Sequence, residues 1–239
     1  MRKVLDRQAR AVEFLDGHLQ RDLPPLRWEI QSDGDLYGWI EGCANGRQLR
    51  AFLKPWAEHL GVPLDMERDL SEVVAEIRPG GHGPLVLCKG WVSWRWPGFG
   101  RPRWRDAPPK PGLEAAQMRG EQRRAATALR ELLQEDLPAL EWEISNMLDE
   151  GPEYLRGRVP AFAIKAAAGD ERAAAVIRDT METWGRFLGS DLVEEPTAVR
   201  VRAEWKQVPV VVELVGSWSF WKAEPPATGG GLWKVVEEE

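Results

Sequence analysis

The chain is poor in the residues that most often form cross-links or carry chemistry. Its 239 residues include only two cysteines, three histidines and two tyrosines. Two cysteines exclude a disulfide-dense scaffold and a four-thiolate zinc site. The longest strongly apolar stretch, from Val208 to Val215, is interrupted by Pro209 and Glu213, so nothing approaches the roughly 20 apolar residues that span a bilayer. The N-terminus also lacks the apolar core of a signal peptide, and we expect a soluble, cytoplasmic protein with no membrane contact.

The motifs of familiar enzyme classes are also missing. The sequence has no G-x-S-x-G, no phosphate-binding loop and no H-E-x-x-H. Within the repeat described below, His18 and His59 align with Leu132 and Phe187, which indicates packing or rim positions, and neither shows ligand spacing with a second His or Cys. His82 lies in a Gly-rich turn. The sequence therefore predicts no catalytic residue, no metal site and no cofactor.

What the chain does have is internal similarity. Residues 19–30 (LQRDLPPLRWEI) return as residues 133–144 (LQEDLPALEWEI), with nine of twelve positions identical at an offset of 114. Ordered matches at nearly constant offsets indicate that one unit occurs twice. Two copies are too few for a solenoid, which needs at least three repeats, so we predict a tandem pair of domain-sized units. Further matches share an offset of 128: Trp56 and Leu60-Gly61 with Trp184 and Leu188-Gly189, and residues 73–78 with 201–206.

Each unit is expected to run helix, strand, strand, helix, strand, strand. Leu26, Trp28 and Ile30 alternate with polar residues, which is the period of a half-buried strand. An antiparallel sheet can leave one face toward water, so we expect an α+β fold. It would be a tandem repeat of two αββαββ units, each a four-stranded antiparallel sheet with two helices on one face. Four tryptophans at equivalent apolar positions are expected in the core: Trp28, Trp56, Trp142 and Trp184.

Composition suggests where the units begin and end. Net charge is −2 over residues 1–94, +4 over residues 95–112 and −8 over residues 113–239. The middle stretch is rich in Pro and Gly, which is typical of a linker. The expected organisation is a first unit at 1–94, a basic Pro/Gly/Trp linker at 95–112, a second unit at 113–222 and a flexible C-terminal tail at 223–239.

Aromatic residues on the open side of the sheet are the first candidate for a binding surface. Tyr37 and Trp39 fall out of phase with their apolar neighbours and should lie on the face away from the helices. Exposed aromatics on a sheet face either pack against something or bind something. We favour packing of the two units, or of two chains, sheet to sheet. The alternative is a stacking platform for bases, although the K/R-G-F/Y signature of sheet-based RNA binders is absent.

The linker is the second candidate. It interleaves Trp96, Arg101, Arg103, Trp104 and Arg105, a combination that can pair with phosphates and stack on bases. The competing interpretation is that it lies across the acidic second unit, held by ion pairs. An overall pI near 5.4 argues against strong non-specific DNA binding.

Two weaker features complete the candidates. Residues 232–236, which include Trp233, follow a glycine spacer; they either add as a strand or anchor to a partner, or fold back on their own body. Glu29 and Glu143 are repeat equivalents on the polar side of their strands, as are Glu76 and Glu204. Such pairs can do acid–base work, but cross-strand pairing with arginines such as Arg27 is the more common arrangement.

The frame Leu-Pro-x-Leu-x-Trp-Glu-Ile, followed by a hairpin, a helix ending in Trp-x-x-x-Leu-Gly and then Arg-Ala-Glu-Trp, resembles small proteins of high-G+C Gram-positive bacteria, their plasmids and their phages. That group has no assigned activity. The resemblance implies an accessory role in a phage or mobile element, and it carries over no functional residue.

The sequence is best explained by a non-catalytic binding protein that contacts a macromolecular partner, most simply another protein. The second hypothesis is a regulatory nucleic-acid binder that uses residues 95–112. The third is an enzyme with a site between the two units. The oligomeric state is left open.

Overall fold

The computed structural model describes residues 2–40, 45–68, 72–77, 86–93, 113–145, 155–167, 170–195, 197–215 and 233–235. Helices and strands alternate along these ranges, which confirms the α+β class. The first half of the chain contains α1 (Arg2–Leu19), β1 (Arg27–Ile30), β2 (Leu36–Ile40), α2 (Gly46–Leu60), β3 (Asp65–Arg68), β4 (Glu72–Ile77) and β5 (Val86–Ser93). The second half contains α3 (Leu113–Leu132), β6 (Glu141–Ile144), β7 (Leu155–Arg158), α4 (Ala161–Ala167), α5 (Glu171–Leu188), β8 (Leu192–Glu195), β9 (Ala198–Trp205), β10 (Val208–Val215) and β11 (Trp233–Val235).

All described strands belong to one sheet, in the order β11-β8-β9-β10-β7-β6-β1-β2-β5-β4-β3. The expectation of a separate four-stranded antiparallel sheet in each unit is therefore wrong. Each half contributes an additional short strand, β3 or β8, and the pairs β2–β5 and β7–β10 are parallel. Alternation of apolar residues predicts which face a strand buries, but it does not encode the direction of its neighbour.

The two halves meet edge to edge through β1 and β6. These strands pair antiparallel, with Glu29 opposite Glu143 and with each flanking tryptophan opposite an isoleucine of the other strand. Outward from this seam, the strand order is the same in both directions: β1-β2-β5-β4-β3 on one side and β6-β7-β10-β9-β8 on the other. The expectation that the two units pack sheet to sheet is therefore wrong.

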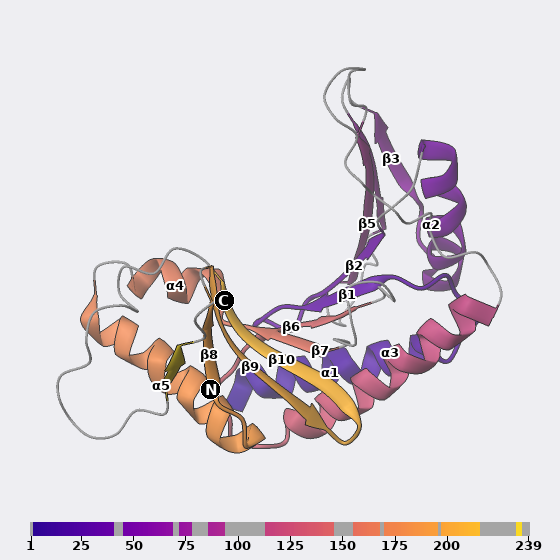
Figure 1. The fold of residues 1–239 in the computed structure, drawn as a ribbon. Helices are drawn as coiled ribbons and strands as arrows, with labels where there is room; N and C mark the ends of the chain where they lie inside the picture. Colours follow the sequence, from indigo (N-terminus) through magenta and orange to yellow (C-terminus); the bar gives the residue numbers. More distant parts are fainter. Residues whose placement is uncertain are drawn as a thin grey trace.

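The helices cover one face of this bent sheet. Figure 1 shows α1 and α3 beneath its middle, with α2 and α5 toward its two ends. On the opposite face, no helix of the described ranges lies over β1, β2, β6 and β7, so it is called the open face below. Helix α5 follows the short helix α4, for which the described residues before α2 contain no counterpart. Among the described helices, none is both long and apolar enough to traverse a lipid bilayer.

The four tryptophans expected in the core are buried there, with matching surroundings. The rings of Trp28 and Trp56 lie 5.1 Å apart at 66°, and those of Trp142 and Trp184 lie 5.4 Å apart at 72°. Trp56 Nε1 donates to the carbonyl oxygen of Pro24 at 2.8 Å, and Trp184 Nε1 donates to that of Pro138 at 3.0 Å. Edge-to-face aromatic contacts of this kind add about 0.5–1.5 kcal/mol beyond area burial.

Buried glutamines connect each first helix to the strand region of the other half. Gln8 Nε2 in α1 donates to the carbonyl oxygen of Leu140 at 2.7 Å, and Gln122 Nε2 in α3 donates to that of Leu26 at 2.6 Å. Both side chains are fully buried. A buried carbonyl left without a donor costs about 1–3 kcal/mol, so this reciprocal pair holds the halves together specifically.

The strand register corrects one part of the sequence alignment. Gly38 lies opposite Cys88, which lies opposite Ile77; Gly157 lies opposite Val212, which lies opposite Val201. Ile77 therefore corresponds to Val201, at an offset of 124 instead of 128. By the same register Glu76 corresponds to Arg200, so the predicted equivalence of Glu76 and Glu204 is wrong. The shift of four arises in the hairpin of β3 and β4: Asp65 lies opposite Glu76, 11 residues later, whereas its counterpart at an offset of 128, Val193, lies opposite Arg200, 7 residues later.

Candidate functional site

An aromatic pair lies on the open face near the seam. Tyr37 and Trp39 of β2 are half-buried, and their rings stack 6.2 Å apart at an angle of 14°. They alternate with Leu36, Gly38 and Ile40, which are buried against the helix side. The prediction that these two aromatics lie away from the helices agrees with this burial pattern. Their partners in β1 are polar: Glu29 lies opposite Tyr37, and Arg27 lies opposite Trp39.

The corresponding positions in the second half are charged. By strand position Arg156 and Arg158 of β7 replace Tyr37 and Trp39. Glu213 of β10 is 2% exposed, and its carboxylate accepts a hydrogen bond from Arg158 Nε at 2.9 Å and from Arg200 Nε at 3.1 Å. The open face thus carries an aromatic pair on β2 where β7 carries two arginines.

Glu213 is held in its charged form. Its burial works toward a higher pKa, but the hydrogen bonds from Arg158 and Arg200, with the nearby charge of Arg156, outweigh it and lower the pKa. Arg156 Nε lies 3.9 Å from the carboxylate. A buried carboxylate surrounded by guanidinium groups stays ionised, which is the form needed to fix the arginines in place.

The ionic network reaches across the seam. Glu143 of β6 is 6% exposed and pairs with Arg158 at 3.0 Å and with Arg27 of the first half at 3.8 Å. Arg27 also pairs with Glu29 at 3.3 Å. Glu29 and Glu143, placed opposite each other in the register, are therefore separated electrostatically by arginines. This arrangement favours the structural interpretation of the two carboxylates over acid–base catalysis.

Two more observations define the edges of the network. Glu195 of β8 forms ion pairs with Arg200 and Arg202 of β9, which extends the chain of charges over six neighbouring strands, from β1 to β8. Glu141 is half-buried, and its pKa is raised by burial and by the neighbouring charge of Glu29. These residues form a balanced set of charges, not a concentration of one sign.

The structure brings together two histidines that the sequence leaves far apart. His18 Nδ1 at the end of α1 and His59 Nε2 at the end of α2 lie 2.7 Å apart. Phe14 stacks edge-on to His18 with ring centroids 4.1 Å apart. Burial lowers the pKa of His18, and the charges of His59 and Arg21 lower it further. Sequence analysis missed this pair because 41 residues separate its members; only their shared position at two helix ends pointed to it.

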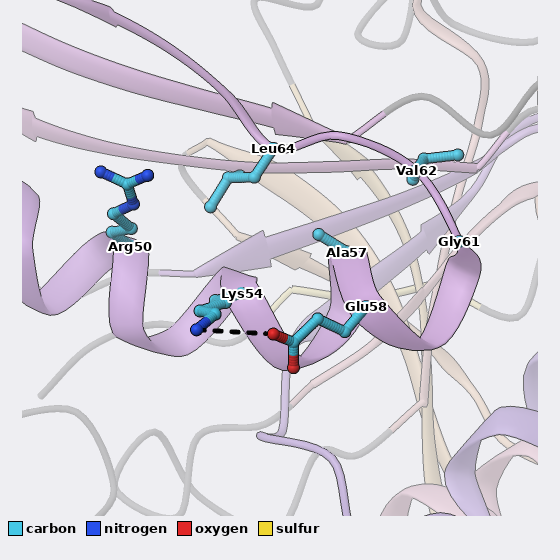
Figure 2. Close-up of a pocket in the computed structure, with 7 residues that line it drawn as sticks. All are labelled: Arg50, Lys54, Ala57, Glu58, Gly61, Val62 and Leu64. Carbon is cyan, nitrogen blue, oxygen red and sulfur yellow. Dashed lines mark ion pairs between the residues drawn. The ribbon is translucent and has the colours of Figure 1, made fainter.

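Two shallow hollows are found among the described residues. One, of about 370 Å³, lies between α2 and the chain entering β3 and has Arg50 and Lys54 on its rim; Figure 2 shows Leu64 facing them. The other, of about 390 Å³, lies between α1, α3 and the β9–β10 turn. In that turn Lys206 has a positive φ of 50° and forms an ion pair with Glu131. The second hollow is also lined by Asp16, Arg123 and Arg124.

The other candidates from the sequence can be located as follows. Trp96, Arg101, Arg103, Trp104 and Arg105 lie outside the described residues. Trp233 belongs to β11, which pairs parallel with β8 of the same chain. In the described part of the chain, no group of three or more His, Cys, Asp or Glu side chains could hold a metal ion. Burial raises the pKa of the Cys88 thiol to about 12, so this cysteine is not a thiolate at neutral pH.

No protein-family model matches the chain, and neither a curated protein nor a solved structure matches it.

Proposed function

We propose that the chain is an internally duplicated, non-catalytic binding protein that contacts another protein through the open face of its sheet. The observation that carries this proposal is the stacked pair of Tyr37 and Trp39, half-buried on a face over which no described helix packs. Tyrosine and tryptophan are the residues most enriched at the energetic centres of protein interfaces. Their planar side chains also lose little entropy when they are fixed by a partner.

The charged half of the face complements this role. The arginines of β7 are held by Glu213 and Glu143, so they are already oriented before a partner arrives. Preorganised charges set the orientation and specificity of a complex, while aromatic anchors contribute most of the affinity. Divergence of a duplicated face into an aromatic half and an ionic half gives one chain two different contacts. The sequence resemblance implies that the chain itself acts as an accessory or regulatory factor of a phage or mobile element.

The proposal is tested by removing the aromatic pair. A Tyr37→Ser/Trp39→Ser variant and the wild type are used as baits in extracts of the source organism. The matched control is Phe162→Ser/Val176→Ser, since both of these side chains are 65% exposed and lie on α4 and α5. Equal thermal unfolding temperatures for the three proteins establish that folding is intact.

We expect one protein to be retained by the wild type and the control and lost from the aromatic variant. With that protein purified, calorimetry should show affinity weakened at least about tenfold by the double substitution. Equal retention by all three baits, or no protein enriched on the wild type, contradicts the proposal. The basic segment 95–112 lies outside the described residues, so no structural observation favours the nucleic-acid alternative.

A further inference from the structure

The two ends of the sheet are built in the same way. Helices α2 and α5 are capped by Gly61 and Gly189, with φ values of 67° and 65°, and after each helix the chain enters a short strand, β3 or β8, a few residues later. These strands, β3 and β8, occupy equivalent places in the strand order. A strand that pairs with the outer edge of β8 therefore indicates what kind of segment the outer edge of β3 can bind.

The outer edge of β8 is covered by β11. This C-terminal strand pairs in parallel, with Trp233 opposite Leu192 and Val235 opposite Glu194. The sheet order ends at β3, whose outer edge has no strand partner among the described residues. An uncovered edge presents backbone donors and acceptors that an extended segment can pair with.

The helices beside the two edges differ in charge. On α2, Arg47, Arg50 and Lys54 are exposed, and among them Lys54 pairs with Glu58 at 3.5 Å. Figure 2 shows Arg50 and Lys54 on the rim of the hollow where the chain turns into β3. At the offset of 128, α5 has Ala175, Arg178 and Glu182 in their place. At these three positions α2 therefore carries three positive charges, one of them paired with Glu58, whereas α5 carries a net charge of zero.

The C-terminal segment 232–239, LWKVVEEE, matches the β3 end better than the β8 end. Its last three residues are glutamates. Strand β8 itself has a charge of −2 from Glu194 and Glu195, whereas the two acidic residues of β3 are partly offset by Arg68, which leaves −1. Because a tight turn joins α2 to β3, the helix and the strand run in opposite directions. A segment added parallel to β3 therefore ends toward Arg50 and Arg47. We propose that the β3 edge of one molecule binds residues 232–239 of a second copy, with the terminal glutamates against the basic face of α2.

This surface is separate from the open face, so its failure would leave the proposed function untouched. Self-association in trans competes with β11 pairing on β8 in the same chain, which has the advantage of a high effective concentration. In this competition, the basic side chains of α2 attract the glutamates of a second copy, whereas Glu194 and Glu195 of β8 repel those of their own chain. Opposite charges across an exposed interface are screened by salt, so the association should be strongest at low ionic strength.

The test is a charge swap in the full chain. Sedimentation equilibrium over a concentration series gives the association constant of the wild type at low and high salt. Arg50→Glu/Lys54→Glu makes the basic face of α2 acidic, and Glu237→Lys/Glu238→Lys/Glu239→Lys makes the C-terminal segment basic. A matched control, Lys165→Glu/Arg172→Glu, reverses two exposed cations on α4 and α5.

We expect the wild type and the control to self-associate equally, and each charge-reversed protein to associate about tenfold more weakly. A mixture of the two charge-reversed proteins should recover a complex, because the basic C-terminal segment of one faces the acidic α2 of the other. A wild type that is monomeric throughout the series overturns the proposal. Self-association that Arg50→Glu/Lys54→Glu leaves unchanged also overturns it, as does a mixture of the two charge-reversed proteins that forms no complex.

Discussion

At the scale of single residues, two glycines show how tightly the core is packed. A Cβ built on Gly38 would lie 2.9 Å from both Leu26 Cδ1 and Trp28 Cζ3, and one built on Gly157 would lie 2.8 Å from Leu140 Cδ1 and 2.9 Å from Trp142 Cζ3. The tryptophan rings therefore occupy the space that a side chain would need. Any larger residue at these positions must displace a ring that is itself fixed by a second tryptophan.

Gly38→Ala and Gly157→Ala should each lower the free energy of unfolding by about 1–3 kcal/mol, which is the usual cost of overpacking a well-filled core. Denaturant unfolding followed by tryptophan fluorescence measures the change. Gly17→Ala is the control, because nothing lies within 4 Å of its Cβ position in α1, and it should stabilise the protein by up to about 1 kcal/mol. A neutral effect of both core substitutions would show that the tryptophans can move freely.

The histidine pair predicts how stability responds to pH. Since the pKa of His18 is lowered in the folded protein, protonation favours the unfolded chain. Its contribution to stability is therefore present above the unfolded pKa of about 6.5 and is lost as the pH falls through the folded value. His18→Leu, which copies Leu132 of the second half, should reduce the loss of stability between about pH 7 and pH 5. Urea unfolding at both pH values measures this.

His59→Phe, which copies Phe187, should reduce the same loss through the same contact. If wild type and both variants lose stability to the same degree on acidification, the acid response comes from other groups, and the histidine contact does not control it.

At the scale of helices and strands, the glutamine bridges carry the strongest prediction. Gln8→Leu removes the donor to Leu140, and Gln122→Leu removes the donor to Leu26. Each should destabilise the protein by about 1–3 kcal/mol, because a buried carbonyl loses its partner. Chemical denaturation of the two single variants and the double variant gives both costs and their coupling.

Exposed glutamine Gln134 lies just after α3 and provides the control, since Gln134→Leu breaks no buried bond. A cost in the control equal to that in Gln8→Leu would mean that the bridges contribute nothing specific.

Sequence patterns predicted the elements better than their pairing. Alternation correctly placed Trp28 and Trp142 in the core and Tyr37 on the opposite side, because side-chain direction follows directly from the strand period. It missed β3 and β8, whose sequences DMER and LVEE show no apolar alternation. It also could not foresee that β2 and β5 run parallel, because the direction depends on how the chain crosses over through α2.

The charged site was less accessible to sequence reasoning than the fold. Glu213 and Arg158 are 55 residues apart, and His18 and His59 are 41 residues apart. No local pattern indicates such contacts, since they depend on which strands and helix ends become neighbours. The linker residues, by contrast, stood out in the sequence through composition alone, and composition gave no position for them.

At the scale of the whole molecule, the halves should unfold together. One hydrophobic cluster includes buried residues of both halves, from Leu5 to Leu214, and the seam between β1 and β6 lies within a single sheet. Two independent domains would give separate transitions. Differential scanning calorimetry should therefore show one transition, with equal calorimetric and van't Hoff enthalpies. Two resolved peaks, or a calorimetric enthalpy well above the van't Hoff value, would contradict this.

The reciprocal glutamines have a further consequence. Each first helix reaches into the opposite half, as subunits do in a homodimer, yet both halves are parts of one polypeptide. In a homodimer every substitution appears at two symmetric places, so neither subunit can change alone. Within a single polypeptide the two halves can be substituted separately, so a change on the surface of one half leaves the other half and both glutamine bridges as they are.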